Sequence, residues 1–269
     1  ELVVIVGSNS VMGKALCQEF LNRGSYVCAL DNENGNISGE LKKYKNNFNF
    51  YKTEIANEID LQIKSQQMIK DFKLNPYVWI NNLGISKVEQ FENILSEDFD
   101  HIIDTNIKGT IYGTRTALSV MKNPERGHIM NISSVNGSVA MPFMSSSVAA
   151  KHAVDGFTRS LQMEKKFKHS AIKIHLVSPG FAKNIMPLAK ETFALPKIFD
   201  FLKSSAESTA KEIVRGLILN RDEITPTISG KLVLGITKYI PGATQLGSRI
   251  LVAKNWKELM GLNPIEMRQ

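Results

Sequence analysis

Gly7, Gly13 and Asp31 have the spacing of residues that bind a dinucleotide. The two glycines bound the stretch GSNSVMG, which follows an apolar run at 2–6 and leads into a helical pattern. A second apolar run at 26–30 then ends in Asp31. In a dinucleotide-binding βαβ unit, the glycine turn lets the backbone approach the pyrophosphate, and an acid after the second strand binds a ribose hydroxyl. Asp31 would repel a 2′-phosphate, so the pattern favours NAD over NADP.

Apolar runs alternate with helical patterns along the rest of the chain. We expect strands at 2–6, 26–30, 48–53, 78–84, 128–132, 172–177 and 223–229. We expect helices up to about 22 and at 55–71, 96–121, 145–168 and 207–219. This alternation is typical of a doubly wound, Rossmann-type α/β fold, here a parallel sheet of about seven strands with helices on both faces. Ser96 is expected to cap its helix, and Pro226 is tolerable only in a strand at the sheet edge.

The size and composition of the chain suit one α/β domain with a C-terminal extension. Its 269 residues are 43% hydrophobic, which is enough for a sizeable core. We expect the domain at 1–230 and the extension at 231–269. No stretch reaches the roughly 18 apolar residues that a membrane-spanning helix needs. Cys17 and Cys28 fall in apolar patterns, so we expect them to be buried free thiols.

The charge balance is basic, with 33 Lys and Arg against 26 Asp and Glu, or +7. Such a balance fits an anionic partner such as a nucleotide or a membrane, but a solvated, mildly basic surface, or a protein of a compartment such as the mitochondrion, is the favoured interpretation. The charges are scattered, and the sequence has no zinc-ligand cluster or RNA-binding aromatic run, so nucleic acid is not predicted as a partner. A targeting segment is not visible, and a mitochondrial or a cytosolic, membrane-associated location both stay open.

The segment 131–157, NISSVNGSVAMPFMSSSVAAKHAVDGF, carries a family resemblance. It resembles the catalytic segment of the short-chain dehydrogenase/reductase family, in which a serine ends one strand and Tyr-x-x-x-Lys opens the next long helix. Ser134 and Lys151 match the family's serine and lysine. Asn106 matches an asparagine that holds a water of the family's proton relay, although a local backbone interaction would explain it equally well. The tyrosine position, four residues before Lys151, is Ser147.

The resemblance covers residues 2 to about 219 and implies a set of cofactor contacts. The implied positions are Gly7, Val11, Gly13, Asp31, Glu54, Asn81, Leu83, Gly84, Lys151, Pro179, Gly180 and Asn184. Val11 replaces a glycine, so we expect it to crowd the phosphates and to resist a positive φ. Leu83 replaces an alanine beside the adenosine and should encroach on it. Asn184 replaces a threonine that touches the nicotinamide, which is a milder change. Asn81 is expected to tie neighbouring strands through backbone hydrogen bonds.

The resemblance also implies a reaction that this sequence is not equipped to run. In the family, a tyrosine phenol exchanges a proton with the substrate oxygen while hydride moves at the nicotinamide. Lys151 would lower the pKa of that phenol and bind the ribose, and Ser134 would polarise the carbonyl. The hydroxyl of Ser147 is too weak an acid for this task, and losing such a proton transfer costs about 10²–10⁴-fold in rate. His152 should point about 100° away from Lys151, and His128 should be remote.

The segment 231–262 is both basic and apolar, and we expect Gly235 and Pro241-Gly242 to break it into short pieces. It resembles the C-terminal extension of family members that rest on membranes. Basic, apolar segments that carry a tryptophan, here Trp256, lie in the bilayer interface. Contact with a membrane surface and contact with a partner subunit are both open. The basic residues, against Glu258 alone, are Lys231, Lys238, Arg249, Lys254 and Lys257.

Four departures from the family pattern (Val11, Leu83, Ser147 and Asn184) fall where cofactor or substrate would sit. The first hypothesis is therefore a degenerate member that does not run the standard reaction and has a structural or binding role, as a subunit of a larger or membrane-associated assembly. The second is an NAD(H)-dependent oxidoreductase acting on a lipophilic alcohol or ketone, which an apolar lid region at 184–205 would suit. The third is a non-catalytic dinucleotide sensor. The cofactor is NAD(H), or none.

The helices expected at 96–121 and 145–168 also suggest an oligomer. In the family, the corresponding helices often form a dimer interface. The second helix has an apolar stripe that could face a partner as well as the core. A homo-oligomer or a protein assembly is therefore expected.

Overall fold

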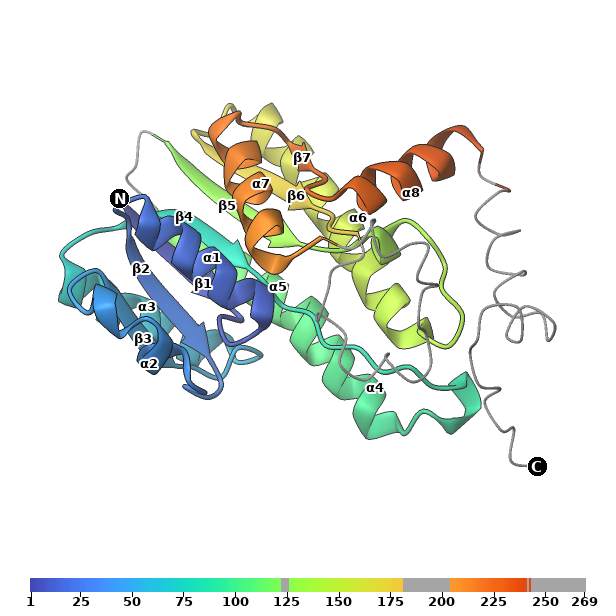
Figure 1. Cartoon of the computed structure of the whole chain (residues 1–269), viewed down its shortest axis with the longest axis horizontal. Helices are drawn as coiled ribbons and strands as arrows, with labels where there is room; N and C mark the ends of the chain where they lie inside the picture. The colour runs from blue at the N-terminus through green and yellow to red at the C-terminus, as the bar shows by residue number, and fades with distance from the viewer. Residues whose placement is uncertain (122–125, 181–203, 241, 243–269) are drawn as a thin grey trace.

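The computed structural model describes residues 1–121, 126–180, 204–240 and 242, and its centre is a seven-stranded sheet (Figure 1). The strand order is β3-β2-β1-β4-β5-β6-β7, and every neighbouring pair is parallel. The strands are β1 (Leu2–Val6), β2 (Tyr26–Asp31), β3 (Phe48–Lys52), β4 (Pro76–Asn81), β5 (Gly127–Ile132), β6 (Ile172–Val177) and β7 (Glu223–Ile224). The predicted doubly wound sheet is confirmed. Its order reverses between β1 and β4, the place where such sheets bind ligands.

Helices cover both faces of the sheet. They are α1 (Val11–Asn22), α2 (Ile37–Glu40), α3 (Glu58–Phe72), α4 (Ser96–Ile103), α5 (Gly109–Val120), α6 (Ser145–Phe167), α7 (Ala206–Ile218) and α8 (Ile228–Tyr239). Short 3₁₀ turns lie at η1 (Lys42–Tyr44), η2 (Phe91–Asn93) and η4 (Val135–Gly137), and a π-helical turn, η3 (Asp104–Lys108), joins α4 to α5. Among the described helices, none is long and apolar enough to cross a membrane.

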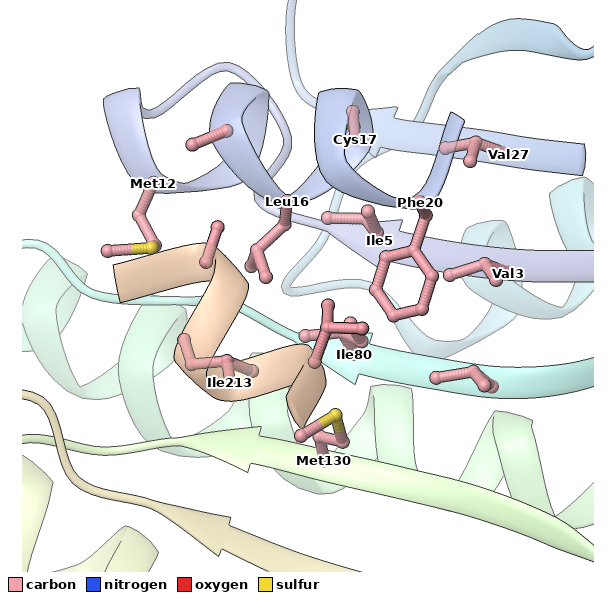
Figure 2. Close-up of a cluster of buried hydrophobic side chains, with 14 of the residues drawn as sticks. Val3, Ile5, Met12, Leu16, Cys17, Phe20, Val27, Ile80, Met130 and Ile213 are labelled. Atoms are coloured by element: carbon pink, nitrogen blue, oxygen red, sulfur yellow. The ribbon is translucent and has the colours of Figure 1, made fainter. Parts of the chain in front are cut away.

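Two buried clusters lie on opposite faces of the sheet, because successive strand side chains alternate between the faces. One cluster joins α1 and α7 to the sheet: Figure 2 shows Leu16 and Phe20 of α1 gathered with Ile80, Met130 and Ile213. The other cluster packs α3 and α5 against the sheet. Each cluster contains one of the two cysteines, and both are buried free thiols, as predicted.

The end of the sheet differs from the prediction. The expected strand at 223–229 is wrong beyond Ile224, because β7 has two residues and α8 begins at Ile228. The physical reason is local: Pro226 has no N–H to donate to the sheet, and the Thr227 side chain accepts a hydrogen bond from Gly230 N, which caps α8. The expectation that this segment lies at the sheet edge is confirmed. Gly235 does not break the chain into pieces, since α8 runs through it.

The predicted helix at 96–121 also needs correction. Leu95 is the N-cap of α4, and Ser96 makes no side-chain cap hydrogen bond, so the capping role predicted for Ser96 is wrong. The helix is not continuous either, because the π-helical turn η3 widens it at 104–108. That turn contains Asn106, which has a partner outside the helix.

Candidate functional site

The glycine turn between β1 and α1 is closed by Asn82, the residue that follows β4. Gly7 has a φ of 81°, and a Cβ there would lie 2.2 Å from the carbonyl oxygen of Asn82. A Cβ on Gly13 would lie 2.4 Å from the Gly7 oxygen. Asn82 Nδ2 donates to Gly7 O and to Ser10 Oγ, both at 2.8 Å, and Ser10 caps α1 by accepting from Gly13 N at 3.0 Å. Only glycine fits at positions 7 and 13, so the turn is a required part of the fold.

The turn presents the N-terminus of α1, where Val11 is the first helical residue. The φ of Val11 is not positive, which agrees with the expectation that a β-branched residue resists that conformation. Its side chain is 47% exposed. The amides of Val11 and Met12 have no carbonyl partner within the helix, and such amides at a helix N-terminus favour anions. The turn can therefore hold a phosphate, while the crowding predicted for the Val11 side chain stays a prediction.

Asp31 ends β2 beside this turn. Its two carboxylate oxygens accept hydrogen bonds from Asn9 N and Asn32 N, each at 2.8 Å. Burial raises the pKa of the Asp31 carboxyl above its ordinary value, and the two N–H bonds oppose that rise. Each oxygen still has a lone pair for a ribose hydroxyl. Glu54 follows the neighbouring strand β3, in which Lys52 pairs with Asp31, so it lies near the same sheet edge with its side chain exposed.

Leu83 follows β4 and turns into the core. It is buried in the cluster that packs α3 and α5 against the sheet. A Cβ on Gly109, in the first turn of α5, would lie 2.7 Å from Leu83 Cδ1. The leucine side chain therefore packs in the core beside Gly109, a residue that the sequence analysis did not select.

Asn81 is fully buried beneath the site. Its Nδ2 donates to Asn131 Oδ1 of β5 at 2.8 Å and to Thr114 Oγ1 of α5 at 3.0 Å, and its Oδ1 accepts from Trp79 Nε1 at 2.9 Å. Asn81 does tie two neighbouring strands, as expected, but it does so through side-chain partners. Its buried amide has the role of a structural link.

Lys151 of α6 joins the ends of two strands. Its Nζ donates to Leu83 O at 2.8 Å and to Ile132 O at 3.0 Å. Burial lowers the pKa of Lys151 to about 8, against the opposing effect of the Asp155 charge. A Cβ on Gly84 would lie 3.2 Å from Nζ, so Gly84 leaves room for the ammonium. The structure thus brings together Lys151 and the strand end after β4.

Ser147 lies one helical turn before Lys151 and is 3% exposed. Its hydroxyl has no hydrogen-bond partner among the described residues. Ser134 caps η4, accepting from Asn136 N at 3.3 Å.

The site also includes Asp155, which the sequence analysis did not select: it accepts a hydrogen bond from Ser133, and burial raises its pKa. The sequence signal for Asp155 was its position four residues after Lys151, which places both side chains on one helix face.

Both polar atoms of the Asn106 side-chain amide bond to the backbone of a single residue, Ile85. Its Nδ2 donates to Ile85 O at 2.9 Å, and its Oδ1 accepts from Ile85 N at 2.8 Å. The π-helical turn η3 carries Asn106, and such turns occur often at functional sites. The partner of Asn106 is therefore a backbone residue outside its own helix, and the two explanations that the sequence left open both stay open.

The loop after β6 meets the start of α8. Pro179 O accepts from Val135 N at 3.0 Å, and Gly180 N donates to Thr227 Oγ1 at 2.8 Å. Asn184, most of the lid region predicted at 184–205, and the extension beyond 242 lie outside the described residues. Within the described part of the chain, no cluster of His, Cys, Asp or Glu could hold a metal ion.

The two histidines set aside by the sequence analysis have hydrogen-bond partners other than Lys151. His152 is exposed and bonds Val148 O through Nδ1. His128, at the far end of β5 from Ser134, contacts His175 Nε2 through Nδ1 at 2.9 Å, and its Nε2 lies 3.3 Å from Tyr77 Oη. His175 Nδ1 bonds a backbone carbonyl and so must carry the proton, which makes the His128 Nδ1–H the donor to His175. Burial lowers the pKa of both His128 and His175.

The chain is similar to known proteins in sequence and in fold. The family model described as short chain dehydrogenase matches residues 1–193. The D-beta-hydroxybutyrate dehydrogenase of Rhizobium meliloti is 28% identical over 182 residues, which are 66% of this chain and 67% of that protein. The putative oxidoreductase SadH of Mycobacterium tuberculosis is 26% identical over 258 residues, which are 87% of this chain and 88% of that protein.

Two solved structures share the fold. A short chain dehydrogenase/reductase from Burkholderia phymatum, solved in complex with NAD, has a TM-score of 0.77 at 19% identity and covers 92% of this chain and 95% of its own. ElxO, solved with NADP bound, has a TM-score of 0.72 at 26% identity and covers 84% of this chain and 96% of its own.

Proposed function

Because the chain belongs to the short-chain dehydrogenase family, we propose that it binds NAD(H) at the carboxyl edge of the sheet without running the family's tyrosine-dependent reaction. Its role would then be that of a binding protein or sensor with the fold of an oxidoreductase. The proposal has two parts, a retained cofactor site and a missing proton donor, and each part has its own support.

The residues of the glycine turn and of β2 fit a dinucleotide. Gly7 and Gly13 keep the turn tight, the open N-terminus of α1 suits a pyrophosphate, and Asp31 has lone pairs left for a ribose hydroxyl. The negative charge of Asp31 disfavours a 2′-phosphate, so NAD(H) is preferred to NADP(H). Similar proteins solved with NAD or with NADP support the class of cofactor.

The observation that carries the second part is the environment of Ser147. The residue is buried one turn before Lys151, and its hydroxyl has no partner among the described residues. An aliphatic hydroxyl there cannot supply the acid that the family's tyrosine supplies. The other titratable side chains on this part of α6 are engaged elsewhere: Asp155 accepts from Ser133, and His152 is bonded to Val148 O at the surface.

The test is to measure cofactor binding and turnover in the same preparation. We expect NADH to bind with micromolar affinity, and we expect a panel of lipophilic ketones and aldehydes to cause no NADH oxidation above the protein-free rate. The Ser147→Ala variant should bind NADH as tightly as wild type, because the hydroxyl has no bonded role. Turnover by wild type with any member of the panel would contradict the missing proton donor.

A second candidate function has one observation in its favour. The pKa of Lys151 is lowered to about 8 by burial, so its ammonium can act as an acid near neutral pH. Two of its three N–H groups are used by Leu83 O and Ile132 O, and the third could donate to a substrate oxygen. In that oxidoreductase, NAD(H) would supply the hydride and Lys151 the proton. Lys151→Ala would abolish turnover. Lys151→Arg would keep the positive charge, but the guanidinium does not release its proton and so cannot act as the acid.

A homo-oligomer through α6 is part of the same proposal. Met163 and Phe167, one turn apart near the end of that helix, are exposed, whereas Leu161 packs against the core. Exposed large apolar side chains of this kind favour a partner contact. Light scattering on the purified protein should give a mass above that of one chain, and Phe167→Ser should lower that mass. A monomeric mass at all protein concentrations would contradict the proposed homo-oligomer.

A further inference from the structure

Helix α8 turns apolar side chains toward solvent. Ile228 is 66% exposed, Leu232 51% and Tyr239 77%, and Ile240 just after the helix is 60% exposed. Its buried residues are Ser229 and Gly230. A surface helix of a folded protein usually keeps its apolar stripe toward the core and its polar residues outward. In α8, Val233, Leu234 and Ile236 are half-buried, and further apolar side chains are exposed, which calls for a partner on the outer side.

The exposed residues form one stripe with a basic flank. At about 100° per residue, Ile228, Leu232 and Tyr239 fall within roughly 40° of one another around the helix. Lys231 and Lys238 lie together at about 80–100° to one side of that stripe. The apolar stripe and the two lysines therefore face a common surface from adjacent sides of the helix.

α8 is fixed to the candidate site at its first turn. Thr227 Oγ1 accepts from Gly180 N at 2.8 Å and from Gly230 N at 3.0 Å. A Cβ on Gly180 would lie 2.4 Å from Gly230 N, so the loop after β6 and the helix touch through their backbones. Figure 1 shows α8 extending from this point to the margin of the molecule. Its outer stripe is thus held at a defined place beside the carboxyl edge of the sheet.

The charge of this part of the chain is of one sign. Between Ile224 and Lys257 the sequence has no Asp or Glu, and its basic residues are Lys231, Lys238, Arg249, Lys254 and Lys257. Two copies that met face to face through α8 would bring like charges together, which disfavours a second copy as the partner. An acid-free segment with an apolar stripe instead suits a surface that is both apolar and negatively charged.

We propose that α8 docks on an anionic lipid bilayer, with Ile228, Leu232 and Tyr239 in the interface and Lys231 and Lys238 at the lipid phosphates. The helix lies on the membrane and does not cross it. The candidate site, joined to α8 through Gly180, would then lie next to the membrane surface. This inference is independent of whether the protein binds NAD(H).

The experiment is co-sedimentation of the full chain with vesicles of phosphatidylcholine with or without phosphatidylserine. We expect binding to the anionic vesicles, weaker binding to the neutral ones, and release as salt is raised. Lys231→Gln with Lys238→Gln should weaken binding by about 30-fold, since each lysine near an anionic surface contributes about fivefold. Leu232→Ser should weaken binding by at least about tenfold, because a leucine side chain no longer enters the interface.

The matched control is Ile59→Ser with Ile63→Ser on α3, where two isoleucines are comparably exposed. This control should bind like wild type, and all variants should keep the wild-type melting temperature because the replaced side chains are exposed. The proposal is overturned if wild type does not sediment with anionic vesicles, or if Leu232→Ser binds as well as the control. It is also overturned if Leu232→Ser dissociates an oligomer while leaving vesicle binding unchanged, because the stripe is then a protein contact.

Discussion

Replacing Asn106 with alanine tests whether this residue, inside a helix, is retained for structure. The side chain is fully buried, and its amide satisfies both the N–H and the C=O of Ile85. The alanine variant leaves both backbone groups without that partner. Each lost partner of a partly buried backbone group costs about 1–2 kcal/mol, so the free energy of unfolding should fall by about 2–4 kcal/mol.

The assay is thermal unfolding followed by circular dichroism. For a chain of this size, 1 kcal/mol corresponds to about 2–4 °C, so Asn106→Ala should lower the melting temperature by roughly 5–15 °C. The matched control is Thr116→Val on α5, because the Thr116 hydroxyl is buried without a partner in the part of the chain that the structure describes. Its removal should leave the melting temperature unchanged or slightly raised. An Asn106→Ala melting temperature equal to wild type would refute the structural role and favour the water-relay interpretation.

Three further predictions address the site and its surroundings. Asp31→Asn should weaken NADH binding by at least about tenfold in calorimetry, since hydrogen bonds to a charged group contribute about 1.5–3 kcal/mol; an unchanged affinity would remove Asp31 from the site. Ser147→Ala should not lower the melting temperature, because the Ser147 hydroxyl has no hydrogen-bond partner among the described residues. A clearly lower melting temperature would indicate that the hydroxyl has such a partner. The pKa of His128 is lowered from 6.5 to about 4 by burial, with a smaller effect of His175, so the unfolded chain binds a proton that the folded chain does not. Stability should therefore be full above pH 6.5 and fall toward pH 4, by up to about 1 kcal/mol per pH unit. His128→Gln should flatten that slope in denaturant titrations, and an unchanged slope would contradict the assignment.

Most of the fold could be predicted because buried parallel strands are continuous apolar runs. The run at 2–6 became β1, and the same pattern held for 26–30 and 172–177. The prediction failed at 223–229, where the cap made by Thr227 and the missing N–H of Pro226 decide between strand and helix. Such local hydrogen bonds have weaker sequence signals than hydrophobic periodicity.

Site residues could be predicted where the backbone geometry requires one residue type. They could not be predicted where the site depends on contacts between segments that are distant in the sequence. Gly7 and Gly13 follow from the tight turn itself. The place of Leu83 depends on Gly109, and the bond between Ser133 and Asp155 joins a strand end to a helix. These pairs meet only in the folded chain, so spacing along the sequence could not reveal them.

The most direct test of the central claim is a calorimetric titration of the purified protein with NADH and NADPH, after any co-purified nucleotide has been removed. The claim is that the glycine turn and Asp31 still form a dinucleotide site although Ser147 stands at the tyrosine position. We predict micromolar binding of NADH and weaker binding of NADPH, by at least about tenfold, because Asp31 repels a 2′-phosphate. Binding of neither nucleotide, or tighter binding of NADPH, would contradict the account.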